Sequence, residues 1–333
     1  SLKAGPSMWS IITSVDREKE SPLSRKAAEN RSKCSRQVSM NRNSANIVFL
    51  FLFTLVGSAC SPSAVETPGS DAITPRNALE NYLANDTVTF KWDLIATDSD
   101  SGVEVADLML TSQEWRGITW KHHLTVMVPD NLEFHDALLF ITGGRLENQE
   151  PEPADPDDDL RKGLLQVCLK NRAVVAILRQ VPNQPLFNGL YEDALISYTL
   201  HQFQETGDFS WPLLFPMTMS AHRAMDAVQE FCRADMHLEV SGFLVSGASK
   251  RGWTSWLTGA SDSRVKAICP MVFDVLNMPV QMDYQVEAWG AYSEEIRDYV
   301  NLGITQILST PEGRELADMI DPYSYREALT QPS

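Results

Sequence analysis

The spacing of apolar residues changes partway along the chain, and this change predicts two kinds of strand. Between residues 90 and 128 apolar and polar positions alternate, which is typical of strands with one face in the core. This pattern predicts antiparallel strands over residues 90–95, 103–110 and 123–128, with a turn at 98–102. A short helix is expected before them, over residues 77–84.

Later in the chain, compact apolar runs alternate with segments of helical spacing. The runs, rich in β-branched residues, predict buried parallel strands over 137–141, 173–178, 242–245 and 265–272. Helical spacing occurs over 159–170, 192–204 and 219–232. This alternation predicts an α/β protein with a doubly wound, mostly parallel sheet. An antiparallel start followed by parallel strands is also the order of an α/β-hydrolase fold, by analogy.

Two segments interrupt this alternation. Residues 147–159 (ENQEPEPADPDDD) are acidic and proline-rich, and they predict a solvated loop without the glycine-containing spacing of a calcium loop. Residues 206–216 (TGDFSWPLLFP) predict a loop lying over apolar surface.

The stretch LEVSGFLVSGASKRG, residues 238–252, carries the strongest indication of chemistry. An apolar strand leads into a tight turn and then a helix-like segment, which resembles a nucleophile elbow. In such an elbow the serine projects above the sheet, and the helix N-terminus faces the charge that develops during reaction. Ser249 is therefore the candidate nucleophile. The spacing departs from G-x-S-x-G because Arg251 stands where glycine is usual and Gly252 follows it.

Acyl transfer also needs donors for the oxyanion, a general base and a group that orients the base. The Lys250 N–H is one candidate donor, and Gly143 and Gly144, just after a predicted strand, could supply the second. An ordinary turn is the alternative for the glycine pair. Arg251 could bind a substrate anion or add to oxyanion stabilisation, or it could simply form a surface ion pair.

The general base has no clear candidate. No histidine follows His237 in the printed sequence, and a hydrolase of this layout needs its base downstream of the serine. Asp274 could orient a base by its position after a strand, or it could cap the next element. All the histidines are expected in core or surface roles; they are His122, His123, His135, His201, His222 and His237.

The first part of the chain predicts export. Residues 40–60 combine a short basic start, a ten-residue apolar run and small residues ending at Cys60, which is the pattern of a secretory signal. The run is too short for a transmembrane helix. Cys60 resembles a lipidated lipobox cysteine, although Gly57 is atypical there; soluble periplasmic export is the alternative. Residues 1–39 are expected to be a non-native or upstream extension, and residues 61–76 a flexible tether to a folded body at 77–333.

Charge and cysteine content limit the partners. Residues 1–59 carry nine Lys/Arg and four Asp/Glu; without them the 28 and 44 of the whole chain become 19 and 40, a net charge of −21. Such a surface should repel nucleic acid and anionic lipid, so membrane contact is expected only through an anchor at Cys60. No metal-ligand spacing is present, and no cofactor is expected. Cys168, Cys232 and Cys269 are expected as buried thiols, with one disulfide possible in an oxidising envelope.

Several longer strings resemble the PhoPQ-activated pathogenicity-related protein family. They include LTSQEW at 110–115, TGDFSWPLLFPM at 206–217, SGASKRGWTSWLT at 246–258 and DPYSYRE at 321–327, and the resemblance spans about residues 77–333. It implies an α/β-hydrolase-like envelope protein of Gram-negative type, with Ser249 at the elbow serine. It also implies that the acid and histidine of a triad lie beyond Ser333. The chain is therefore expected to be truncated at its C-terminus, to lack the last strands, and to be inactive or nearly so.

The sequence thus predicts an exported serine hydrolase-like protein that cleaves an ester or amide in the envelope. Three alternatives stay open: a non-catalytic envelope protein whose acidic surface binds cationic peptides or partners, a carbohydrate esterase like the glucuronoyl esterases, whose G-x-S-x-R-G string is similar, and a fragment without a stable fold. The substrate and the oligomeric state are not predicted.

Overall fold

A computed structural model describes residues 72–85, 89–153, 155 and 157–333. The predicted upstream extension, the signal segment with Cys60 and most of the tether lie outside the described residues. The described residues fall in one unit, Pro68–Ser333. Among them, no helix is both long enough and apolar enough to cross a bilayer.

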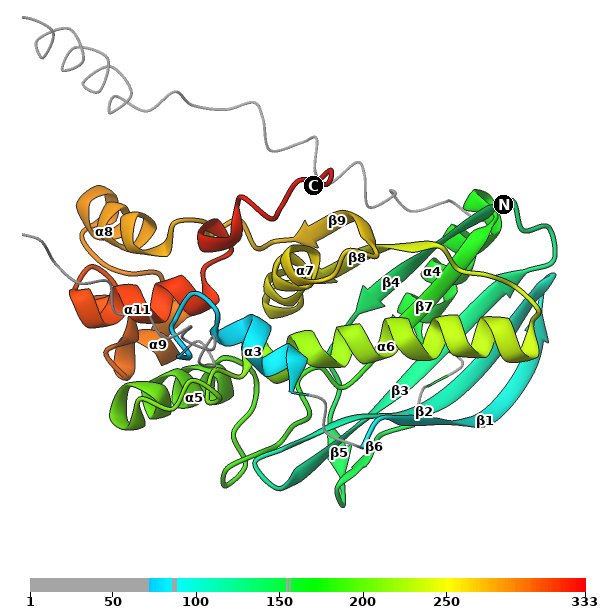
Figure 1. The fold of residues 1–333 in the computed structure, drawn as a ribbon, viewed down its shortest axis with the longest axis horizontal. Helices are drawn as coiled ribbons and strands as arrows, with labels where there is room; N and C mark the ends of the chain where they lie inside the picture. The colour runs from blue at the N-terminus through cyan, green and yellow to red at the C-terminus, as the bar shows by residue number, and fades with distance from the viewer. Residues whose placement is uncertain (1–71, 86–88, 154, 156) are drawn as a thin grey trace, which may run out of the picture. The chain divides into compact units, whose positions relative to one another are not determined.

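A seven-stranded sheet forms the centre of this unit (Figure 1). Its order is β1-β2-β3-β7-β4-β8-β9. The strands are β1 (Lys91–Asp100), β2 (Val103–Trp115), β3 (Ile118–Pro129), β7 (Ala173–Leu178), β4 (Phe134–Ile141), β8 (Gly242–Ala248) and β9 (Val265–Met271). Strands β1, β2, β3 and β7 pair antiparallel, whereas β7, β4, β8 and β9 pair parallel. The predicted antiparallel start and parallel continuation are confirmed.

Strands β2 and β3 are longer than their apolar patterns predict. The alternation ends near Leu110, but β2 continues through buried polar residues to Trp115. These residues stay in the sheet because their side chains have partners: Ser112 Oγ lies 2.9 Å from His122 Nε2, and Gln113 donates to the Pro216 carbonyl at 2.7 Å.

Helices cover both faces of the sheet. On one face α6 (Leu214–Asp235) and α7 (Lys250–Ser261) pack on the strands and on each other, and α3 (Ala78–Ala84) packs on α6. On the other face α4 (Asp159–Asn171) packs on β7, β3 and β2. Its buried residues form a small cluster of their own with those strands. This two-sided covering is what the alternation of strands and helices predicts.

The two predicted loops are partly wrong. Helix α6 begins at Leu214, so the last residues of the predicted 206–216 loop are helical; Pro216 is tolerated because it lies in the first turn. The acidic segment contains a short hairpin, β5 (Leu146–Glu147) with β6 (Glu150–Pro151), before α4 begins at Asp159.

A group of short helices follows β9, and the sequence pattern does not predict them. They are α8 (Met278–Trp289), η1 (Glu294–Ile296), α9 (Arg297–Asn301), α10 (Ile304–Ile307), α11 (Pro311–Ile320) and η2 (Pro322–Tyr325). They lie on the same side of the molecule as α5 (Glu192–Thr206), which α9 and α10 contact (Figure 1).

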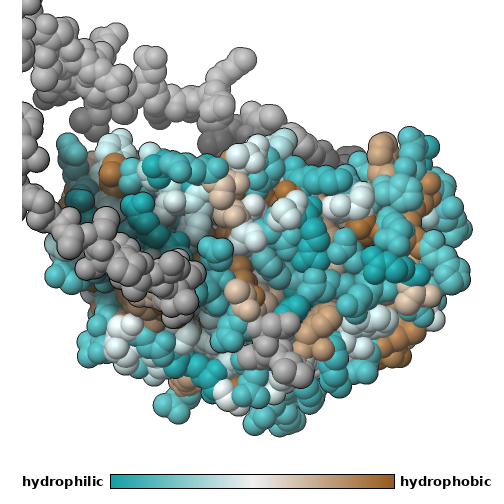
Figure 2. Space-filling view, in the orientation of Figure 1, coloured by the Kyte–Doolittle hydropathy of each residue, from teal (hydrophilic) through white to brown (hydrophobic). Residues whose placement is uncertain are grey.

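The three cysteines among the described residues are free thiols, and one prediction about them is wrong. Cys168 and Cys232 are buried, as expected, whereas Cys269 is exposed. On β9 the neighbouring Ile268 is buried and Cys269 points to the opposite face. Among the described residues α4 contacts β7, β3 and β2 on that face, and no helix there packs on β9. Figure 2 shows the molecule from the same direction as Figure 1, and hydrophilic residues cover most of the face seen there, in keeping with the acidic composition.

Candidate functional site

Ser249 occupies the bend between β8 and α7. Its backbone has φ 57° and ψ −124°, a conformation that L-residues rarely adopt. Its N–H donates to the Met271 carbonyl at 2.9 Å, which fixes the bend to the end of β9. The residue is exposed, and its peptide precedes the N-terminus of the 12-residue helix α7. The structure therefore gives Ser249 the backbone geometry of a nucleophile elbow.

Two glycines make this bend possible. A Cβ at Gly247 would lie 2.7 Å from the Arg251 Cβ and 2.8 Å from the Arg251 carbonyl oxygen. A Cβ at Gly252 would lie 2.9 Å from the Met271 carbonyl oxygen. Because backbone atoms cannot move aside as a flexible side chain can, both positions need glycine. The second glycine of the motif thus allows close packing of α7 against β9.

The Gly143–Gly144 pair lies beside the elbow. Strand β4, which ends just before it, pairs in parallel with β8, and Ile141 is opposite Gly247. The Gly143 carbonyl accepts from the Gln180 N–H at 2.9 Å, and the Gly144 carbonyl accepts from Gln184 Nε2 at 3.0 Å. The two peptide planes are therefore held in place next to the candidate nucleophile.

The guanidinium of Arg251 is engaged within the protein. Its Nη1 and Nη2 each lie 2.7 Å from one oxygen of the Glu192 carboxylate, and its Nε donates to the Val181 carbonyl. It also lies against Gly143, where a Cβ would be 2.6 Å from Nη2. Arg251 thus connects the elbow to the glycine pair and to the start of α5. Arg251 is thus paired with an acid, as one of the sequence-based alternatives expected, but the pair is partly buried and not on the surface. Binding of a substrate anion by Arg251 stays a prediction.

Glu192 is ionised by its surroundings. Burial alone would raise the pKa of this carboxyl group, but hydrogen bonds and charge from Arg251, with hydrogen bonds from Gln184 and Lys250, lower it to about 2. Lys250 Nζ lies 2.9 Å from Glu192 and 3.1 Å from Asp193. The two cations that follow Ser249 are therefore both paired with carboxylates of α5.

Asp193 extends this network to the helices after β9. Its Oδ1 accepts from the Tyr299 hydroxyl at 2.9 Å. Burial first, and then the negative charge of Asp193, raise the pKa of Tyr299 well above its usual value, so the hydroxyl stays protonated. The elbow and α9 are thereby joined through one carboxylate.

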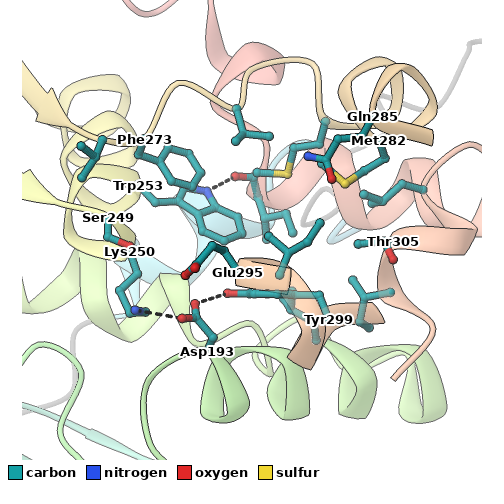
Figure 3. Close-up of a pocket in the computed structure, with 18 residues that line it drawn as sticks. Asp193, Ser249, Lys250, Trp253, Phe273, Met282, Gln285, Glu295, Tyr299 and Thr305 are labelled. Atoms are coloured by element: carbon teal, nitrogen blue, oxygen red, sulfur yellow. Dashed lines mark hydrogen bonds and ion pairs between the residues drawn. The ribbon is translucent and has the colours of Figure 1, made fainter. Parts of the chain in front are cut away.

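A cavity of about 270 Å³ opens beside Ser249 (Figure 3). We call residues 192–193 and 247–253 the elbow side, of which Asp193, Ser249, Lys250 and Trp253 line the cavity, and residues 278–320 the helical side. Trp253 joins the two sides. Its ring stacks on that of Phe273, with the ring centroids 4.9 Å apart, and its Nε1 donates a hydrogen bond to the Ile320 carbonyl. The volume is close to the lower end of the range for small-molecule sites.

The histidines and Asp274 do not contribute to the described lining of this cavity. None of the residues found to line it is a histidine. His122 is buried between Ser112 and the Arg179 carbonyl, and burial lowers its pKa to about 4. His222 contacts Ser261 and Asp262 at the far end of α7, and burial lowers its pKa to about 4 as well. Asp274 is exposed just after β9.

Sequence reasoning did not single out Glu192, Asp193, Glu295 or Tyr299. Glu192 and Asp193 begin a predicted helix, where acidic residues are common in any case. The cations that pair with Glu192 and Asp193 lie at least 57 residues away along the chain, as in the Lys250–Asp193 pair. The one sequence feature that could have indicated their pairing is that an acidic pair, Glu192–Asp193, and a basic pair, Lys250–Arg251, each stand at the start of a helix-like segment.

Comparison with solved structures supports the fold assignment. The acetyl xylan esterase from Paenibacillus sp. R4 matches with a TM-score of 0.50 and 12% identity, over 77% of this chain and 75% of that chain. A glucuronoyl esterase from Solibacter usitatus matches with a TM-score of 0.40 and 10% identity, over 75% and 80%. The acetyl xylan esterase is an α/β-hydrolase-type esterase, so the α/β-hydrolase-like fold is confirmed. At 12% identity this match shows the fold alone.

Sequence comparison identifies the family. The autocrine proliferation repressor protein A of Dictyostelium discoideum is 34% identical over 299 residues, which cover 86% of this chain and 56% of that protein. The chain thus spans little more than half the length of this relative. The family model of the PhoPQ-activated pathogenicity-related proteins matches residues 79–333. With the matched region beginning in α3 and including the whole Ser249 elbow, the chain belongs to the PhoPQ-activated pathogenicity-related protein family.

Proposed function

We propose that this protein is a serine hydrolase that cleaves an ester or amide, with Ser249 as its nucleophile. The observation that carries the proposal is the backbone of Ser249, φ 57° and ψ −124°, at an exposed bend beside a cavity. Strain of this kind costs free energy, of order 1–3 kcal/mol in general, and it persists where the surrounding structure holds it. Here two glycines and the Met271 carbonyl hold it.

In the proposed reaction Ser249 Oγ attacks the substrate carbonyl carbon and passes its proton to a general base. The Lys250 N–H, at the N-terminus of α7, donates to the oxyanion, and the Gly143–Gly144 segment supplies the second donor. The C–O or C–N bond of the substrate then breaks, and the alcohol or amine leaves with the proton. Water then attacks the carbonyl carbon of the acyl-enzyme, the ester bond to Ser249 Oγ breaks, and the carboxylic acid leaves as Ser249 regains its proton.

The general base and its orienting acid are proposed from the family resemblance, because no histidine is among the described residues that line the cavity. The pattern of residues 40–60 further supports action outside the cytoplasm, in the cell envelope, with or without a lipid at Cys60.

Labelling with a fluorophosphonate probe tests Ser249. The full-length protein should be labelled, and Ser249→Ala should reduce labelling at least 100-fold, in line with loss of a catalytic nucleophile. The matched control is Ser263→Ala, an exposed serine beyond the other end of α7, which should label like the wild type. Equal labelling of wild type and Ser249→Ala would remove Ser249 from the mechanism. No labelling of the full-length protein would favour a non-catalytic binding role.

A further inference from the structure

The elbow side of the cavity is electrically balanced, although it begins with two cations. Lys250 and Arg251 directly follow the candidate nucleophile, and both are buried. Glu192 pairs with both cations, and Asp193 pairs with Lys250. Two positive and two negative charges therefore lie within ion-pair distance. An anionic substrate would find no unpaired cation here.

The helical side offers an apolar surface. Met278, Met282, Ile304, Leu308 and Ile320 line the cavity there, and each is at most 6% exposed. Trp253 and Phe273 continue this surface toward Ser249 (Figure 3). Burying apolar groups of a ligand against such a surface is favourable, whereas a charged group there would lose its hydration without gaining a partner.

One ionisable group on the helical side has no counter-charge. Glu295 lines the cavity, and in Figure 3 its side chain projects into the space between the two sides. Among the described residues it forms no ion pair, whereas the neighbouring Glu294 pairs with Arg297. The charges around the cavity, Lys250, Arg251, Glu192, Asp193 and Glu295, therefore sum to one negative charge.

We propose that this cavity accepts the uncharged, apolar acyl or alcohol group of the substrate, and that Glu295 selects against anionic groups. The inference rests on the proposed function in that it names the substrate class of the same site. A site that binds a sugar acid needs an unpaired cation for the substrate carboxylate. The proposed substrate class therefore differs from that of such a site. A volume of about 270 Å³ limits the group to a small one, such as a short alkyl chain or a single aromatic ring.

Ligand binding tests this inference without requiring turnover. The background is Ser249→Ala in the full-length protein, and the probes are phenylacetamide and phenylacetate, which have the same shape and differ in charge. Calorimetric titration at low ionic strength should show the amide binding about tenfold more tightly, as expected for one unscreened like charge nearby. Along the series acetamide, propionamide and butyramide, affinity should rise about threefold to fourfold per methylene.

Glu295→Gln tests the role of the carboxylate. This side chain is exposed, so the variant should fold normally, and the amide-to-acid ratio should fall to about threefold or less as the like charge disappears. Glu294→Gln, on the same 3-10 helix η1 but outside the cavity lining, is the matched control and should keep the ratio. High salt should reduce the ratio in the wild-type background.

The outcomes separate this inference from the nucleophile assignment. Acid binding as tight as amide binding, or no binding of either probe, would overturn the substrate class even if fluorophosphonate labels Ser249. An unchanged ratio in Glu295→Gln would overturn the selective role of that residue. Discrimination by charge in a protein that fluorophosphonate does not label would support the binding inference and refute the proposed hydrolase.

Discussion

On the elbow side of the cavity the cations are paired and the backbone is tightly packed, whereas the helical side is lined by apolar side chains and one unpaired carboxylate. Lys250 and Arg251 are held by Glu192 and Asp193. The helical side is held mainly by apolar burial and is tied to the elbow side by the Tyr299–Asp193 and Trp253–Ile320 hydrogen bonds. The difference indicates a division of roles. The elbow side fixes the position of Ser249, and the helical side determines which ligand group can bind next to Ser249.

This division has a physical basis. Paired charges and backbone contacts are directional, so they suit a side that must keep a strained bend in place. Apolar contacts are not directional, so a surface built from them selects a ligand by size and polarity. Substitutions on the elbow side should therefore affect stability, and substitutions on the helical side should affect mainly which ligand binds.

Glycine substitutions should give the largest effect. Gly247→Ala forces a methyl group to within 2.7–2.9 Å of Arg251 backbone and Cβ atoms, and it should lower the free energy of unfolding by about 3 kcal/mol. On the helical side Gly290→Ala meets no atom within 4 Å, and only its φ of +77° opposes it, at about 1 kcal/mol. Urea denaturation measures both.

Gly163→Ala is the control for the glycine substitutions. Gly163 lies within α4 with open space around it, so alanine there should stabilise the protein by about 0.5–1 kcal/mol. Equal costs for Gly247→Ala and Gly290→Ala would contradict the claim that the elbow side is the more tightly packed.

Removing the Glu192 charge should have the next largest effect. Glu192→Gln leaves Arg251 buried without its carboxylate and should cost about 2 kcal/mol at pH 7, less than for a fully buried pair because Glu192 is 37% exposed. Glu295→Gln on the helical side should change stability by less than about 0.5 kcal/mol. A cost for Glu295→Gln as large as that for Glu192→Gln would erase the distinction between the two sides.

The pH dependence checks the same variant. Because the pKa of Glu192 is lowered to about 2 in the folded protein, its contribution is present above the ordinary glutamate pKa of 4.5 and is lost as the pH falls toward 2. As the pH is lowered from 5 to 2.5, the melting temperature of the wild type should therefore fall more steeply than that of Glu192→Gln. Thermal unfolding at a series of pH values measures both. Parallel profiles would show that Glu192 does not carry this pH dependence.

The smallest effect concerns the strained bend itself. Glycine adopts a φ of 57° and ψ of −124° more readily than alanine, so Ser249→Gly should be about 1 kcal/mol more stable than Ser249→Ala. Ser255, a buried residue within α7, is the control: there the glycine variant should be the less stable by about 1 kcal/mol. A difference of the same sign at both positions would argue against strain at the elbow.

The sequence was sufficient to predict the central sheet and the position of Ser249. Compact β-branched runs mark β7, β4 and β9, and the glycines around Ser249 mark the bend, because these signals act within a few residues. Interactions such as Arg251–Glu192, which join residues 59 apart, leave no local pattern in a chain with 44 acidic residues. They depend on the strand order, which the apolar pattern does not determine.

The helices after β9 and the exposure of Cys269 were not predicted for related reasons. Helices α9 and α10 have only five and four residues, too few for a clear 3.6-residue period. Cys269 follows a buried isoleucine in an apolar run that indicates burial on both faces of β9. Whether a strand is covered on one face or two depends on which helices reach it, and that is a property of the tertiary structure.

Strand β8 enters the sheet next to β4, whose residues precede it by about one hundred positions along the chain, for example Ile141 beside Gly247. Such non-local pairing is slow to form, because the entropy of closing the intervening chain is lost before the contact is gained. The serine bend and the glycine pair therefore come together only after β4 and β8 have paired. With Ser249 as the proposed nucleophile, a covalent serine probe should label refolding protein only after β4 and β8 have paired, and not while secondary structure alone forms.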